Sequence, residues 1–105
     1  MTICDSTPLK STADFRRAAD VFKALSNPSR VMIVNALAEG KRCVADLTKL
    51  VQLDISTVSA HLAVLRRVGI LTDERRGTQV FYSLRKPCLL NLFCCLDDFH
   101  SNETP

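Results

Sequence analysis

The stretch from residue 43 to residue 69 constrains the fold more than any other part of the chain. It reads "CVADLTKLV", then Gln52-Leu53-Asp54, then "ISTVSAHLAVLRRVG", and both longer pieces repeat apolar side chains at helical spacing. A short helix, a three-residue turn and a longer helix make a helix-turn-helix. Asp54 is suited to cap the second helix and Gly69 to end it. The spacing therefore predicts a helix-turn-helix whose second helix covers residues 55–68.

Regular elements are predicted on both sides of this unit. Helical spacing covers residues 12–26, and a second helix begins at Pro28, behind the cap-like Asn27, and stops at Gly40. The stretch "ILTDERRGTQVFYSL" holds two β-rich runs, which predict a hairpin joined across Arg76-Gly77-Thr78. A closing helix is expected after Pro87, as far as about His100. The fold class is mainly α with a β-hairpin wing, a winged helix-turn-helix.

One domain accounts for the length of the chain. With 105 residues it can bury a thin core, which a partner subunit would usefully extend. We expect a flexible N-terminal arm over residues 1–11, a folded domain over 12–100 and a frayed C-terminus over 101–105. Neither a signal-peptide pattern nor a run of about 18 apolar residues is present. These features predict a cytoplasmic protein with no membrane partner, whose five cysteines are mostly reduced.

Charge and helix surface both favour double-stranded DNA as a partner. Residues 41–86 hold nine Lys and Arg against four Asp and Glu, a balance that suits a polyanion. The outer face of the helix over 55–68 is small and hydroxylated, as a helix that enters a major groove requires. Two arginines at the hairpin tip can reach a phosphate or the minor groove. The residues predicted to contact DNA are Ser56, Thr57, Ser59, Ala60, His61, Arg67, Arg75 and Arg76.

His61 has two readings. It lies beside the apolar face of its helix with no second histidine nearby, which makes a metal or catalytic role poorly supported. We interpret it as a hydrogen-bonded structural histidine that is also within reach of the DNA backbone.

Three stretches together resemble the ArsR/SmtB family of winged-helix, metal-responsive repressors. They are "FKALSNPSRVMIVNAL", "VADLTKLVQLDISTVSAHLAVLRRVGIL" and "RRGTQVFYSL", which fall in the family's order within residues 13–86. The resemblance implies a cytosolic homodimer, dimeric through its terminal helices, that binds an inverted repeat and leaves it when an inducer binds. One departure is Asp54-Ile55-Ser56, where many members have Ser-Gln-Pro, so the operator sequence is not implied.

The cysteines also depart from the family's arsenic sensors. Those sensors carry ELCVCDLC before the turn, whereas this chain has "KRCVADLT", in which Cys43 matches one ligand while Ala45 and Thr48 replace the others. Cys94 and Cys95 instead stand together at the edge of the apolar stripe of the closing helix. Adjacent thiolates suit a soft ion, so we predict that Cys94 and Cys95 bind trivalent arsenic, an organoarsenical or trivalent antimony as inducer. The candidates for a third sulfur ligand are Cys4, Cys43 and Cys88.

Three alternatives stay open. A zinc sensor would need His100 with Asp97, Asp98, Glu103 and thiols as ligands. A thiol redox sensor would oxidise Cys94 or Cys95 instead of binding a metalloid. A thiol-dependent enzyme would be expected to show a C-x-x-C motif or a placed Cys-His pair, neither of which is evident, so we expect no catalytic residues and no catalytic cofactor.

Overall fold

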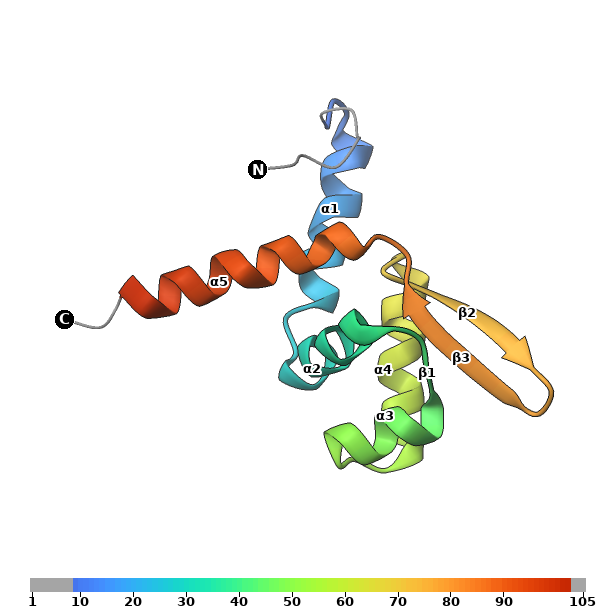
Figure 1. Ribbon diagram of the computed structural model, residues 1–105. Helices are drawn as coiled ribbons and strands as arrows, with labels where there is room; N and C mark the ends of the chain where they lie inside the picture. Colours follow the sequence, from blue (N-terminus) through green and yellow to red (C-terminus); the bar gives the residue numbers. More distant parts are fainter. Residues whose placement is uncertain (1–8, 103–105) are drawn as a thin grey trace.

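The computed structural model describes residues 9–102, with side chains as far as Phe99. Helices dominate it, and a hairpin and the last helix extend away from the helical body in different directions (Figure 1). The elements in chain order are α1 (Thr12–Ala24), α2 (Pro28–Ala36), η1 (Leu37–Glu39), β1 (Arg42–Cys43), α3 (Val44–Val51), α4 (Ile55–Arg67), β2 (Leu71–Arg76), β3 (Gln79–Leu84), η2 (Pro87–Leu89) and α5 (Leu90–Asn102).

Side chains at the helix starts explain where the first two helices begin. The Ser11 hydroxyl accepts a hydrogen bond from the Asp14 N–H, and the Asp14 carboxylate accepts one from the Ser11 N–H, which makes a capping box. The amide oxygen of Asn27 accepts from the N–H groups of Ser29 and Arg30, with proline in the first turn of α2. The two helices predicted before the helix-turn-helix are therefore confirmed, with the second one tightening into η1 before the chain turns.

The helix-turn-helix is confirmed, and its turn depends on a left-handed residue. Gln52 ends α3 with φ 56° and ψ 43°, a conformation that a non-glycine residue adopts only in special positions. Asp54 then caps α4, because its side chain accepts a hydrogen bond from the Thr57 N–H. The two helices are thus set at an angle by three residues, as the spacing predicted.

The wing is the predicted hairpin with an unpredicted third strand. Strands β2 and β3 pair antiparallel from Leu71 opposite Leu84 to Arg76 opposite Gln79, which leaves a two-residue turn where Gly77 has φ 63°. The two-residue strand β1 pairs with the other edge of β3, so the strand order is β1-β3-β2. A pairing this short leaves no periodic pattern in a sequence, and only the tertiary structure reveals it.

The core lies between α2, α3, α4 and the base of the wing. Tyr82 and Leu84 of β3 pack against it, and so does Phe93 of α5. Beyond Phe93, α5 leaves the body, and Leu96 and Phe99 are 49% and 69% exposed. The buried core residues are Ala24, Ile33, Val34, Leu37, Leu47, Val51, Val58, Leu62, Leu65, Ile70 and Leu71. Within residues 9–102, no helix is both long and apolar enough to cross a membrane.

Candidate nucleic-acid interface and thiol site

The predicted outer face of α4 is the exposed face in the structure. Ser56, Ser59 and Ala60 are exposed and Thr57 is half-buried. On the inner face of the helix, Val58, Leu62 and Leu65 have no exposed surface. Small side chains on this face leave the helix backbone close to any surface that it meets. This geometry is the one that a helix needs to lie in a major groove.

Asp54 organises the two hydroxyls at the start of this face. Its carboxylate accepts a hydrogen bond from the Ser56 hydroxyl, a second from the Thr57 hydroxyl at 2.6 Å, and a third from the Thr57 N–H at 3.2 Å. The bonds from Ser56 and then Thr57 lower the pKa of Asp54 to about 2. Each hydroxyl donates its proton to the Asp54 carboxylate. Its oxygen is therefore left as a hydrogen-bond acceptor. The sequence pointed to Asp54 as a helix cap, but not to this effect on its neighbours.

The two wing arginines differ in their contacts. Arg76 forms an ion pair with Glu74 at 3.3 Å, and its guanidinium lies 6.0 Å from the ring centroid of Phe81. Glu74 also binds Lys41 at 3.1 Å, and the hydrogen bond from Lys41, followed by that from Arg76, lowers the pKa of Glu74. Arg75 is exposed and donates a long bond of 3.5 Å to the Gly77 carbonyl. Of the pair, Arg75 is the more readily turned toward a phosphate.

A cavity brings the wing turn next to the start of α4. It measures about 270 Å³ and is lined by residues of α3, α4 and the hairpin, among them Ser59, Thr78 and Gln79. Ser59 and the wing turn are therefore neighbours in space, although 19 or more positions separate them in the sequence. The predicted groove-reading helix and the predicted wing share one side of the molecule, as a DNA interface requires.

His61 and Arg67 were also predicted to contact DNA, and their neighbours lie in α2 and α1. Arg30 donates a hydrogen bond from Nε to Nδ1 of His61 at 3.1 Å, which confirms the hydrogen-bonded structural role. Burial, and then the Arg30 charge, lower the pKa of His61. Arg67 lies 11 residues beyond Ser56, about 16 Å along the helix axis, beside α1. The structure therefore does not bring Arg67 together with the hydroxylated start of α4.

An ion pair that the sequence did not suggest fixes the wing to α4. Arg66 Nε donates to the Asp73 carboxylate at 2.7 Å, close to where β2 leaves the core. Arg66 lies on α4 and Asp73 on β2, so the pair joins two different elements and no periodicity within one element signalled it.

The two thiols of the predicted inducer site are accessible. Cys94 and Cys95 are free and exposed, and they lie on the half of α5 that extends from the body. Cys43 is also free, but it is only 7% exposed at the start of α3. Cys88 precedes α5, in η2, and is disulfide-bonded. The remaining candidate, Cys4, lies outside the described residues.

A closed metal site is not assembled from the part of the chain that the structure describes. Within it, no three His, Cys, Asp or Glu side chains come together in a way that would hold a metal ion. Two residues of the zinc alternative, the side chain of His100 and Glu103, fall outside the described side chains. What the described residues offer is a pair of adjacent free thiols on one helix.

Comparisons with known proteins agree with this geometry. A family model for the arsR family of bacterial regulatory proteins matches residues 27–73. An uncharacterised helix-turn-helix transcriptional regulator of Methanocaldococcus jannaschii is 38% identical over 69 residues, which are 65% of this chain and 78% of that protein. The arsenic resistance transcriptional regulator ArsR1 of Pseudomonas putida is 43% identical over 65 residues, 61% of this chain and 51% of the regulator.

A solved structure extends the likeness to nearly the whole chain. It is the solution structure of a homodimeric winged helix-turn-helix DNA-binding domain from Mycobacterium bovis, described as a possible ArsR-family regulator. The TM-score is 0.81 at 27% identity, covering 96% of this chain and 95% of that one. This chain spans between 50% and 78% of the length of the curated relatives that it matches. The matched family model, the sequence relatives and the shared fold show that this chain, a winged helix-turn-helix protein, belongs to the ArsR/SmtB family of transcriptional regulators.

Proposed function

We propose that this protein is a dimeric transcriptional repressor that leaves its operator when a trivalent arsenic or antimony compound binds Cys94 and Cys95. The observation that carries the proposal is the pair of adjacent, exposed, free thiols on the protruding half of α5. The protein acts on DNA in the cytoplasm, a reducing compartment in which the free thiols of Cys94 and Cys95 stay available. Its role is regulatory rather than enzymatic, as in the relatives described above.

The DNA-reading surface combines α4 with the wing. Ser56, Thr57, Ser59 and Ala60 enter the major groove, where the hydroxyls oriented by Asp54 accept hydrogen bonds from base amino groups. Arg75 and Arg76 approach the backbone or the minor groove beside it. His61 and Arg67 lie outside this set, because His61 is bonded to Arg30 and Arg67 stands at the far end of α4.

Exposed apolar residues on the terminal helices support a homodimer. Phe15 and Phe22 of α1 are 57% and 61% exposed, and Leu96 and Phe99 of α5 are exposed to a similar degree. Four large apolar side chains on the first and last helices suit burial against a second copy of the same surface. Two recognition helices would then meet successive major grooves about 34 Å apart.

The number of available sulfurs favours one class of inducer. Cys94 and Cys95 supply two ligands, and the buried Cys43 and disulfide-bonded Cys88 are poor third ligands. An aryl or methyl arsenical already carries one carbon substituent and needs only two sulfurs, so it fills its three positions on this pair. Binding beside the dimer helices needs a coupling free energy of about 1–3 kcal/mol to change DNA affinity by one or two orders of magnitude.

A DNA titration tests the proposal. A fluorescein-labelled duplex, selected by the protein from a random pool, is titrated and followed by anisotropy with phenylarsenite, arsenite, antimonite, zinc or peroxide added. We expect phenylarsenite to weaken DNA binding by about tenfold or more in the wild type and to leave Cys94→Ser/Cys95→Ser unaffected. Cys43→Ser is the matched control and should respond like the wild type. Release of DNA from the double variant by arsenicals would show that the site lies elsewhere.

A thiol redox sensor is the second candidate. The observation that favours it is the exposure of two neighbouring free thiols beside a chain segment that already contains a disulfide-bonded cysteine. In the same titration it predicts release by peroxide, reversal by dithiothreitol and no response to phenylarsenite. A response to zinc alone would indicate the zinc-sensing alternative.

A further inference from the structure

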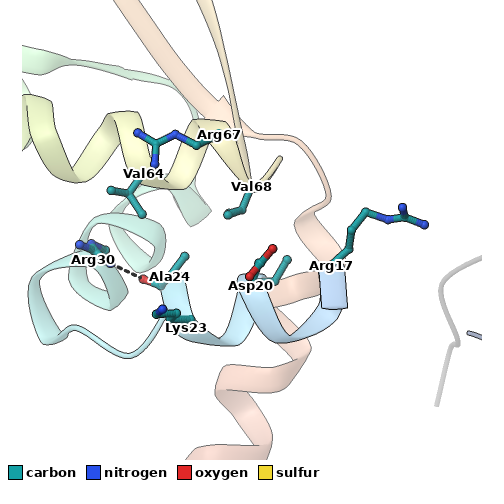
Figure 2. Close-up of a pocket in the computed structure, with 9 residues that line it drawn as sticks. Arg17, Asp20, Lys23, Ala24, Arg30, Val64, Arg67 and Val68 are labelled. Carbon is teal, nitrogen blue, oxygen red and sulfur yellow. Dashed lines mark hydrogen bonds between the residues drawn. The ribbon is translucent and has the colours of Figure 1, made fainter. Parts of the chain in front are cut away.

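A second cavity lies between α1, α2 and the C-terminal end of α4. It measures about 520 Å³, within the range of pockets that hold small organic ligands. Figure 2 shows its walls: α1 contributes one side, while Arg30 of α2 and Arg67 of α4 approach from the other. None of the described residues that line it is a cysteine, and neither Cys94 nor Cys95 of the predicted inducer site is among them.

The charges around this cavity are strongly unbalanced. Arg17, Lys23, Arg30 and Arg67 line it, against one acidic residue, Asp20. Arg17 is turned away from the other side chains in Figure 2. It forms an ion pair with Asp14. Three cations against one carboxylate remain, which is a setting that favours a bound anion.

Arg30 is held in place at the inner end of the cavity. It is half-buried, its Nε donates to His61 at 3.1 Å, and its Nη1 donates to the Ala24 carbonyl at 3.3 Å. A guanidinium carries five N–H donors, so these two bonds leave hydrogens for a ligand without any need to reorient the group. A preorganised arginine binds a carboxylate at a lower entropic cost than a mobile one.

The floor of the cavity is apolar and small. Val21 and Ala24 of α1 line it together with Val64 and Val68 of α4. A DNA phosphate or a free inorganic ion gains nothing from such a floor, whereas a ligand with an apolar body buries it there. The combination suits a molecule with one negative group and a compact apolar part.

This cavity does not compete with the proposed dimer surface. At 3.6 residues per turn, the cavity positions 17, 20, 21 and 24 lie about 110–170° around α1 from the direction of Phe15 and Phe22. The apolar face of α1 can therefore be covered by a second copy while the cavity stays open.

We infer that this cavity is a binding site for a small organic anion, with its carboxylate held by Arg30 and Arg67 and its apolar body on the valine floor. The site goes beyond the proposed response to arsenicals and does not depend on it. Arg30 also donates a hydrogen bond to His61 in the middle of α4. A ligand bound to Arg30 is therefore connected to the recognition helix through this bond.

Benzoate is the probe that tests the site. In a titration of the full chain followed by amide NMR, without DNA, we expect benzoate to shift the resonances around Val21, Ala24, Val64 and Val68 and the His61 ring. Benzamide, which has the same shape and no charge, should bind at least about tenfold more weakly, as the loss of a charge-assisted bond requires. Inorganic phosphate and acetate, which lack the apolar body, should bind more weakly than benzoate as well.

Charge variants of neighbouring residues give matched controls. Arg67→Gln should weaken benzoate binding about tenfold and Asp20→Asn should strengthen it, whereas Arg66→Gln should leave it unchanged because Arg66 is paired with Asp73 away from the cavity. Thermal melts establish that each variant is folded. Equal binding of benzoate and benzamide, scattered shifts, or equal losses in Arg66→Gln and Arg67→Gln would overturn the inference. So would an Arg67→Gln variant that binds benzoate normally and instead loses DNA affinity and salt dependence.

Discussion

Arg30 donates a hydrogen bond to Nδ1 of His61 at 3.1 Å and so ties the first turn of α2 to the middle of α4. The acceptor is the neutral imidazole, because a protonated ring has no lone pair to offer at Nδ1. Burial and the Arg30 charge both lower the pKa of His61, which keeps the ring in this neutral form. The orientation of the recognition helix relative to α2 therefore depends in part on a group whose protonation would break this hydrogen bond.

Replacing Arg30 should change this titration. In Arg30→Met the charge is removed while much of the burial remains, so we expect the pKa of His61 to rise toward its ordinary value of 6.5 without reaching it. A ¹H–¹³C NMR titration of the imidazole measures it directly. An unchanged pKa would mean that burial alone controls the ring.

The titration of His61 should also make the free energy of unfolding decrease as the pH is lowered. The unfolded chain takes up a proton at His61 near pH 6.5, before the folded protein does, so this contribution to stability is complete above that pH. It is lost as the pH falls through the lower pKa of the folded state. Urea titrations from pH 7.5 to 5 should show this decline in the wild type and a weaker one in His61→Gln. A decline of equal size in His61→Gln would show that other titrating groups cause the loss of stability.

Asp54 places a permanent negative charge at the tip of the proposed DNA-reading helix. Its pKa of about 2 keeps it ionised at any usable pH. Asp54→Asn retains the helix cap and removes the charge, so we expect DNA affinity to rise by a few-fold at low salt. Asp46→Asn, in the first turn of α3, makes the same change in net charge and should have a smaller effect. Anisotropy titrations at two salt concentrations compare them, and equal gains would indicate a general charge effect.

Asp54→Ala should behave differently from Asp54→Asn. It removes the cap and the acceptor that orients the Ser56 and Thr57 hydroxyls, so a lower melting temperature and weaker discrimination between DNA sequences are expected. Circular dichroism melts and competition with mismatched duplexes measure the two effects. A variant with unchanged sequence preference would show that the oriented hydroxyls do not read bases.

The inner face of α4 should dominate stability. Leu62 has no exposed surface, so Leu62→Ala removes buried methyl groups and leaves a cavity, with an expected loss of about 2–5 kcal/mol in the free energy of unfolding. Leu50 is 49% exposed on α3, and Leu50→Ala should cost below about 1 kcal/mol. Urea denaturation distinguishes the two. Similar losses of stability in Leu62→Ala and Leu50→Ala would contradict the burial of Leu62 in the core.

The proposed dimer makes a prediction about α1. Phe22→Glu puts a charge in the exposed apolar face, where burial against a second copy would be strongly unfavourable, so we expect a monomer with much weaker DNA binding. Met32→Glu, on α2, changes an exposed apolar residue away from the terminal helices and should remain dimeric. Size-exclusion chromatography with light scattering reads the mass of both. A dimeric Phe22→Glu variant would contradict an interface through α1.

The helical and strand patterns were predictable because they depend on neighbours in the chain. Apolar residues at helical spacing showed which face of α4 is buried, and Asn27 and Asp54 marked two helix starts through bonds to N–H groups only two or three residues away. The hairpin followed from two β-rich runs around a glycine that the turn requires at positive φ. The exposure of Cys94 and Cys95 followed from their place beside an apolar stripe.

The sequence by itself thus determined the order of the elements, the helix-turn-helix and the candidate thiols, since each is set by local spacing. Only the tertiary structure decided the pairing of β1 with β3, the Arg66–Asp73 and Arg30–His61 contacts, and the burial of Cys43. It also showed that Arg67, predicted to contact DNA, lines a cavity beside α1 at the far end of α4 from Ser56. Each of these joins residues from different elements, and such contacts depend on how the elements pack, which no periodicity in one segment encodes.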